Sequence, residues 1–184
     1  MASIRSLRAN VTRKEALEQF SPTGPSGILQ DALFGPLRSV ADFYVPFRIF
    51  EVEITNGGKR ESTIFGLDAV TGSLDLYRFE CPPDPAQLIE IETRNYAPPE
   101  LDSAQASGLV SEKVRRVIFT RGFFRMRNLR IVSTPLAVEL SIPYWVGFRG
   151  REERARITVI DAVRRKFEGA KVRHLLQNWL SNQS

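Results

Sequence analysis

Histidine and cysteine, the side chains most often used for metal binding and nucleophilic catalysis, each occur once in this chain of 184 residues. Cys81 precedes two prolines in a stiff loop, and His174 lies in a stretch with helical periodicity. A Cys/His metal site therefore cannot form, and any metal would need carboxylate ligands alone. A serine nucleophile would have to recruit His174 as its base, and no GxSxG motif is there to present such a serine. We expect no catalytic residue and no metal site.

The sequence also lacks the glycine-rich loops that bind nucleotide phosphates. Neither GxxxxGK[ST] nor GxGxxG occurs, so we expect no cofactor. An enzyme that uses only carboxylates and arginine stays open, but no reaction can be named for it. The sequence therefore favours a non-catalytic binding or interaction protein.

The formal net charge of +5 is a small difference between two strongly charged segments. Residues 31–102 carry 6 Lys and Arg against 13 Asp and Glu, whereas residues 103–184 carry 16 against 6. Such a division favours either two halves of the chain that attract each other or an anionic partner.

Part of the basic segment interleaves arginine with phenylalanine, which is typical of platforms that bind single-stranded nucleic acid. Within 18 residues the basic side chains are Lys113, Arg115, Arg116, Arg121, Arg125, Arg127 and Arg130, and the aromatic ones are Phe119, Phe123 and Phe124. The candidate residues for a nucleic-acid site are Arg121, Phe123, Arg125 and Arg127. The alternative is that the phenylalanines pack under a sheet and that the arginines are solvated or pair with the acidic segment.

A third hypothesis is a small-molecule pocket lined by aromatic side chains. Tyr144, Trp145 and Phe148 follow one another closely in a predicted strand. A curved sheet covered by a helix can enclose an apolar ligand, so Tyr144 and Trp145 are its candidate residues. The alternative is that Trp145 and Trp179 anchor the hydrophobic core.

Hydrophobic periodicity and capping motifs place these candidates on a succession of helices and short strands. Thr12 and Glu15, like Asp102 and Gln105, have the spacing of a helix cap in which the two side chains bond reciprocally. Residues 1–10 are expected to form a loose lead-in. The predicted helices are 12–20, 28–33, 102–122 and 172–180, and the predicted strands are 50–54, 61–67, 74–79, 88–93, 129–132, 136–148 and 155–162.

One arrangement of these elements occurs twice. Pro46 leads through a hairpin to Asp68-Ala69-Val70-Thr71-Gly72, and Pro143 leads through a hairpin to Asp161-Ala162-Val163-Arg164-Arg165, each after a capped helix. The pattern predicts an internal duplication. The two aspartates are expected to bond the amides of their own turns, the alternative being a site that the pair shares.

The first of these hairpins carries a further signal. Phe50-Glu51-Val52-Glu53-Ile54 leads through the tight turn Asn56-Gly57-Gly58-Lys59 to Leu67-Asp68-Ala69-Val70-Thr71-Gly72. This stretch of 23 residues resembles the hairpin of PepSY-like domains, and Thr12-Arg13-Lys14-Glu15-Ala16-Leu17 resembles the helix opening that often precedes it. The resemblance implies a cystatin-like packing of a helix on an antiparallel sheet and a binding or inhibitory role. The family is typically extracytoplasmic.

Together these features predict an α+β protein in which antiparallel sheets pack against helices, in two related cystatin-like halves, residues 1–100 and 101–184, packed as one unit. The N-terminus has no apolar signal region, and no window reaches the roughly 18 apolar residues of a membrane span. We therefore expect a cytoplasmic protein without a membrane span. The expected partner is a protein or a small molecule, with nucleic acid as the alternative and a homo-oligomer left open.

Overall fold

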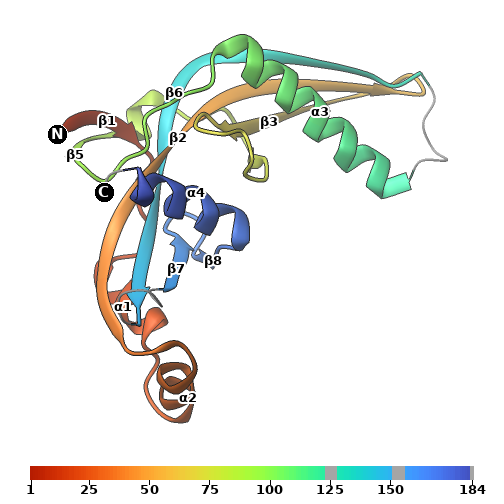
Figure 1. The fold of residues 1–184 in the computed structure, drawn as a ribbon. Coiled ribbons are helices and arrows are strands. Elements are labelled where there is room, and N and C mark those ends of the chain that lie inside the picture. Colours follow the sequence, from red (N-terminus) through yellow and green to blue (C-terminus); the bar gives the residue numbers. More distant parts are fainter. Residues whose placement is uncertain (123–127, 151–155, 183–184) are drawn as a thin grey trace. The chain divides into compact units, whose positions relative to one another are not determined.

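The structure is a computed structural model that describes residues 1–122, 128–150 and 156–182. Helices and strands follow one another along these ranges, which confirms an α+β protein (Figure 1). The helices are α1 (Arg13–Phe20), α2 (Pro25–Phe34), the 3₁₀ helix η1 (Pro85–Gln87), α3 (Ser103–Gly122) and α4 (Ala170–Ser181). The strands are β1 (Ala2–Ser6), β2 (Leu37–Asn56), β3 (Lys59–Asp68), β4 (Tyr77–Phe79), β5 (Ile89–Thr93), β6 (Arg130–Arg149), β7 (Arg156–Asp161) and β8 (Lys166–Phe167).

The chain divides into two compact units, and each takes segments from both ends of the sequence. Unit 1 consists of Met1–Val45, Ile89–Ala97 and Ser141–Ser184, and unit 2 consists of Pro46–Leu88 and Pro98–Leu140. The long strands β2 and β6 supply residues to both units.

Hydrogen bonding connects the strands in the order β4-β3-β2-β6-β1-β5, with β7 paired to β6 and β8 paired to β7. Most pairs are antiparallel, but β1 runs parallel to β6, with Ser6 opposite Ser141. The sheet is therefore mixed, and the prediction of purely antiparallel sheets is wrong. The cause is β1, which lies where a loose lead-in is expected. Its partners β5 and β6 are distant in the sequence, so the pairing leaves little local signal.

In unit 2, helix α3 covers one face of the sheet strands β2 and β3 (Figure 1). The cap predicted for this helix is confirmed, because the Gln105 amide donates to Asp102 over 2.8 Å and the Asp102 amide donates to the Gln105 side chain over 3.1 Å. The core between helix and sheet consists of Phe50, Val52, Leu67, Ala106, Val110 and Val114. Val117 follows Val110 and Val114 at the i+7 spacing of one helix face, but 44% of it is exposed, so the buried stripe of α3 narrows at that turn.

In unit 1, helices α1 and α4 supply most of the helical core. The Thr12 cap of α1 is confirmed, since Glu15 and Thr12 bond each other reciprocally. The Thr12 amide that donates to the Glu15 carboxylate lowers the pKa of that carboxyl below its usual value. In α4, Val172, Leu175 and Leu176 lie at the i, i+3 and i+4 spacing of one helix face, and all three are buried. Trp179 stacks edge-on against Phe43 with 4.7 Å between ring centroids, as expected of a core anchor.

The two hairpins of the predicted duplication have equivalent registers. Phe47 on β2 lies opposite Asp68 on β3, and Tyr144 on β6 lies opposite Asp161 on β7. One residue further on, the Ala69 amide donates to the Pro46 carbonyl over 2.8 Å, and the Ala162 amide donates to the Pro143 carbonyl over 3.0 Å.

The equivalence extends to the segments that lead into the two capped helices. In each hairpin the proline has no N–H, so it cannot donate a hydrogen bond to the carbonyl of the alanine opposite it. That carbonyl can therefore accept hydrogen bonds from other amides. The Ala69 carbonyl accepts from the amides of Glu100 and Leu101, just before α3, and the Ala162 carbonyl accepts from those of Asn10 and Val11, just before α1. Because of the proline, each alanine carbonyl is available to bind the segment that leads into a helix.

Arg165 occupies the turn position that Gly72 occupies in the first hairpin, and both are left-handed, with φ of 59° and 67°. A side chain in that conformation costs roughly 1 kcal/mol. We therefore expect Arg165→Gly to raise the free energy of unfolding by about 0.5–1 kcal/mol, measured by urea denaturation. The variant also loses an exposed ion pair with Glu15, which is worth little.

Arg165→Ala is the control for this change, because it removes the same ion pair but keeps the β-carbon. The prediction requires Arg165→Gly to be the more stable of the two. If they unfold at the same urea concentration, relief of the left-handed strain is not the cause.

Candidate functional site

Asp68 and Asp161 are the two aspartates that could share a site, but each carboxylate accepts hydrogen bonds from the backbone of its own turn. Asp68 is fully buried, and its Oδ1 accepts from the amides of Thr71 and Gly72 over 2.9 and 2.8 Å while its Oδ2 accepts from the Leu74 amide over 2.8 Å. Asp161 is equally buried, and its Oδ1 accepts from the amides of Val163 and Arg164, each over 2.8 Å. The Asp68 carboxylate, which accepts from three backbone amides, therefore holds its own turn together.

The candidate pocket residues Tyr144 and Trp145 lie in the core of unit 1. Tyr144 is 3% exposed. Trp145 is half-buried and packs against the cluster that contains Ala16 and Phe20, and its indole N–H donates to the Val11 carbonyl over 2.7 Å. These contacts correspond to the core-anchor alternative, and neither residue lines the recess described below.

Most of the candidate nucleic-acid residues cannot be placed. Phe123, Arg125 and Arg127 lie outside the described residues, and Arg121 is placed only as a backbone position near the end of α3. Two other cations of this segment make bonds within unit 2. Lys113 donates to the Leu74 carbonyl over 2.6 Å, and Arg116 pairs with Glu112, four residues before it.

A titratable cluster that sequence reasoning missed surrounds Tyr44. Its hydroxyl donates to Asp42 over 3.1 Å, and the side-chain amide of Asn95 donates to the other oxygen of that carboxylate over 3.2 Å. Burial, followed by the neighbouring Asp42 charge, raises the pKa of Tyr44 to about 12. Tyr44 therefore stays protonated at neutral pH, and the cluster ties β2 to the segment after β5.

The single cysteine and the single histidine are both exposed. Across residues 1–122, 128–150 and 156–182, no three His, Cys, Asp or Glu side chains are grouped closely enough to hold a metal ion. None of the helices in these ranges is both long and apolar enough to cross a membrane.

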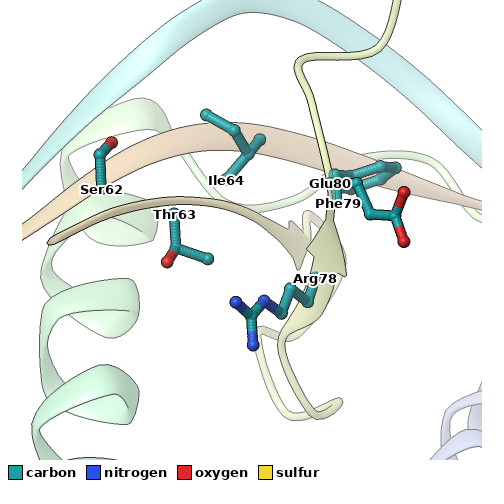
Figure 2. A pocket seen from close by; sticks show the side chains of 6 residues that line it. All are labelled: Ser62, Thr63, Ile64, Arg78, Phe79 and Glu80. Carbon is teal, nitrogen blue, oxygen red and sulfur yellow. The ribbon is translucent and has the colours of Figure 1, made fainter.

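A recess lies in unit 2 at the outer edge of β3, where β4 ends. Figure 2 shows the side chains that line it, namely Ser62, Thr63, Ile64, Arg78, Phe79 and Glu80. The neighbours Thr63 and Ile64 point to opposite sides of the strand, so the recess opens around the edge of the sheet (Figure 2). Ile64 is buried and Phe79 is partly buried, whereas Ser62 is exposed.

The backbone at this edge is a row of hydrogen-bonding groups. The two-residue turn Gly57-Gly58, with φ of 57° and 84°, closes the β2–β3 hairpin at the pair Asn56 and Lys59. In a turn of this type, Asn56 and Lys59 bond each other through their backbone groups. Because the direction of these groups alternates along a strand, the N–H and C=O of even-numbered β3 residues point away from β2.

Only part of that row is covered by β4, the neighbour that the described strands supply on this side of β3. The β4 register covers Ile64, Phe65 and Gly66, while β3 continues to Lys59. The main-chain groups of Arg60 and Ser62 therefore point outward beyond the end of β4. They repeat at roughly 6.6–6.8 Å, the spacing of alternate residues in a strand.

The signal that could have revealed this edge is a difference in strand length. The sequence predicts a strand over 74–79, but the structure restricts it to Tyr77–Phe79. Cys81-Pro82-Pro83 follows almost at once, and consecutive prolines cannot extend a hydrogen-bonded ladder. The prolines mark where coverage of β3 stops.

Comparison with protein-family models, with curated proteins and with solved structures finds no match for this chain. The resemblance to PepSY-like domains therefore stays a prediction. A functional interpretation has to come from the residues and their geometry.

Proposed function

We propose that this protein binds an extended polypeptide segment, which adds as a further strand to the edge of β3 beyond β4. The observation that carries the proposal is the uncovered part of β3, where the outward groups of Arg60 and Ser62 lie beside a recess. An extended backbone presents donors and acceptors at the same alternating spacing, so a strand is the ligand that such an edge fits.

The side chains around the recess set the chemistry of the segment. On one side of the strand, Ile64 and the ring of Phe79 offer an apolar surface, and on the other side Thr63 offers a hydroxyl group (Figure 2). Successive side chains of an added strand point to opposite faces. We therefore expect a segment in which the residue opposite Ser62, on the same side of the sheet as Ile64 and Phe79, is apolar and its neighbours are polar.

The first experiment selects short random peptides displayed on phage against the purified full chain. One enriched peptide is then synthesised with a fluorescent label and titrated by anisotropy. Ser62→Pro removes the outward N–H of Ser62 without removing a bond to β2, so we expect it to weaken binding about tenfold or more.

Two controls separate strand addition from other modes of binding. Ser62→Ala removes the hydroxyl that donates to Glu51 but keeps the backbone N–H, so this variant should bind as the parent does. The same peptide is also made in two versions, each with methyl groups on alternate backbone nitrogens. The version whose methyl groups replace the N–H groups that face β3 should lose affinity, and the other version should keep it. Equal binding by Ser62→Pro and the parent, or the absence of any enriched peptide, would overturn the proposal.

A further inference from the structure

Strand β5 in unit 1 ends the row of hydrogen-bonded strands. It pairs with β1 along its whole length, from Ile89 opposite Ser6 to Thr93 opposite Ala2. Within the described ranges, no strand pairs with its other side. The main-chain groups of β5 that β1 does not use are therefore available to a further strand.

The pairing of β1 determines which groups of β5 lie on the free side. The Leu7 amide donates to the Ser141 carbonyl on β6 over 3.0 Å, so the backbone groups of odd-numbered residues along β1 face β6. The even-numbered β1 residues therefore bond the odd-numbered β5 residues that lie opposite them. Because the direction of these groups alternates along a strand, the N–H and C=O of Glu90 and Glu92 point outward.

The side chains of the same two glutamates place negative charge at this edge. Both are exposed, and neither forms an ion pair with a described residue. On the inner side, Arg5 lies opposite Glu90, but the residue opposite Glu92 is the uncharged Ser3. Opposite charges on neighbouring strands attract when they lie directly across from each other. A strand added on the outer side would gain this attraction if it carried a cation opposite each glutamate.

We infer that the β5 edge binds an extended segment of a basic protein, with Lys or Arg opposite Glu90 and Glu92. The backbone of the segment bonds the outward N–H and C=O groups of these two residues. Since successive side chains alternate between faces, the two basic residues are separated by one residue, which lies on the same side of the sheet as the half-buried Ile91 and is apolar. This surface belongs to unit 1 and does not depend on the β3 edge in unit 2.

Repulsion argues against a second copy of this chain as the occupant. Two β5 strands that paired antiparallel about an axis at Ile91 would place Glu90 of one copy opposite Glu92 of the other. A shift of the register by two residues would place one of these glutamates opposite itself. Like charges directly opposite each other destabilise a strand pair, whereas Lys or Arg at these positions replaces repulsion by attraction.

The test is fluorescence anisotropy of the full chain with a labelled peptide in which lysine and valine alternate. We expect binding that weakens when the salt concentration rises from about 0.1 to 0.5 M. Glu90→Lys/Glu92→Lys should bind this peptide roughly tenfold more weakly, and should instead bind a peptide in which glutamate replaces lysine. Both side chains are exposed, so the double variant should keep the parent's unfolding transition.

Two controls separate strand addition from attraction to the overall charge. Glu100→Lys/Glu112→Lys changes the net charge equally at exposed side chains of unit 2, and it should leave binding unchanged. Methyl groups on the backbone nitrogens of the peptide's lysines, which would face β5, should abolish binding. Methyl groups on the nitrogens of its valines should not.

Ser62→Pro keeps this test separate from that of the β3 edge, because the variant should bind the lysine peptide as the parent does. If Ser62→Pro loses binding and Glu90→Lys/Glu92→Lys keeps it, the peptide occupies the β3 edge and the inference is overturned. It is also overturned if the parent does not bind the lysine peptide, since the glutamates would then only keep other strands away from β5. Light scattering that shows a dimer for the parent and a monomer for Glu90→Lys/Glu92→Lys would equally overturn it.

Discussion

Replacing Asp68 by alanine should lower the free energy of unfolding by roughly 3–5 kcal/mol, the largest effect that we expect from a single substitution in this chain. The side chain is fully buried and accepts from the amides of Thr71, Gly72 and Leu74. Alanine would leave these three donors without their acceptor, and each buried unsatisfied group costs about 1–3 kcal/mol. The turn cannot relax outward cheaply, because Gly72 packs under Leu109 and Leu101.

Two further variants make the measurement interpretable by urea denaturation. Asp68→Asn keeps one acceptor oxygen and should lie between the parent and Asp68→Ala, which provides a value even where the alanine variant is too unstable to purify. Asp84→Ala is the control for aspartate removal, since Asp84 is exposed and accepts from a single amide, that of Ala86; it should cost less than about 1 kcal/mol. Equal losses for Asp68→Ala and Asp84→Ala would contradict the structural role of Asp68.

The features that the sequence predicts correctly are those that local chemistry determines. The Thr12 and Asp102 caps need only a side chain and an amide three residues apart, and both form as predicted. The Gly57-Gly58 turn supplies its own left-handed residues. Asp68 is predicted to bond its own turn because aspartate after a strand does so without help from distant residues.

The features that the sequence does not predict depend on partners elsewhere in the chain. β1 is a strand because β5 pairs with it, although its own residues carry a weak pattern. The sequence predicts two strands on either side of Pro135, because proline lacks an N–H. In the structure β6 continues through it, since within unit 2 the described strands give β6 a single neighbour, β2. A strand that has a neighbour on one side only tolerates proline.

The candidate site was out of reach for a related reason. Composition draws attention to arginines and aromatic rings such as Tyr144 and Trp145, but Tyr144 is buried and Trp145 packs against a core cluster of unit 1. The edge of β3 has no unusual residue type. It is defined by where β4 stops, and the prolines that follow β4 indicate that point only once β4 is known to pair with β3.

Replacing Arg149 by alanine should lower the free energy of unfolding by roughly 2–4 kcal/mol. The side chain is 1% exposed and donates to three oxygens, those of Asp31, Gly35 and Phe20. Removing it leaves two backbone carbonyls without a donor and a cavity the size of a long side chain. Arg149→Met would fill most of that volume without donating, so the difference between the two variants separates packing from hydrogen bonding.

The loss should be concentrated at α2, because the guanidinium joins the end of α1, the middle of α2 and the residue after α2. We expect hydrogen exchange of the α2 amides in Arg149→Ala to accelerate strongly, while the α3 amides keep the protection of the parent. Asp31→Asn should have a smaller effect, since 47% of the Asp31 side chain is exposed. Arg116→Ala, which removes an exposed ion pair, should change the free energy of unfolding by less than about 0.5 kcal/mol. If Arg149→Ala behaves like Arg116→Ala, α2 is held by its other contacts and the anchoring role of Arg149 is refuted.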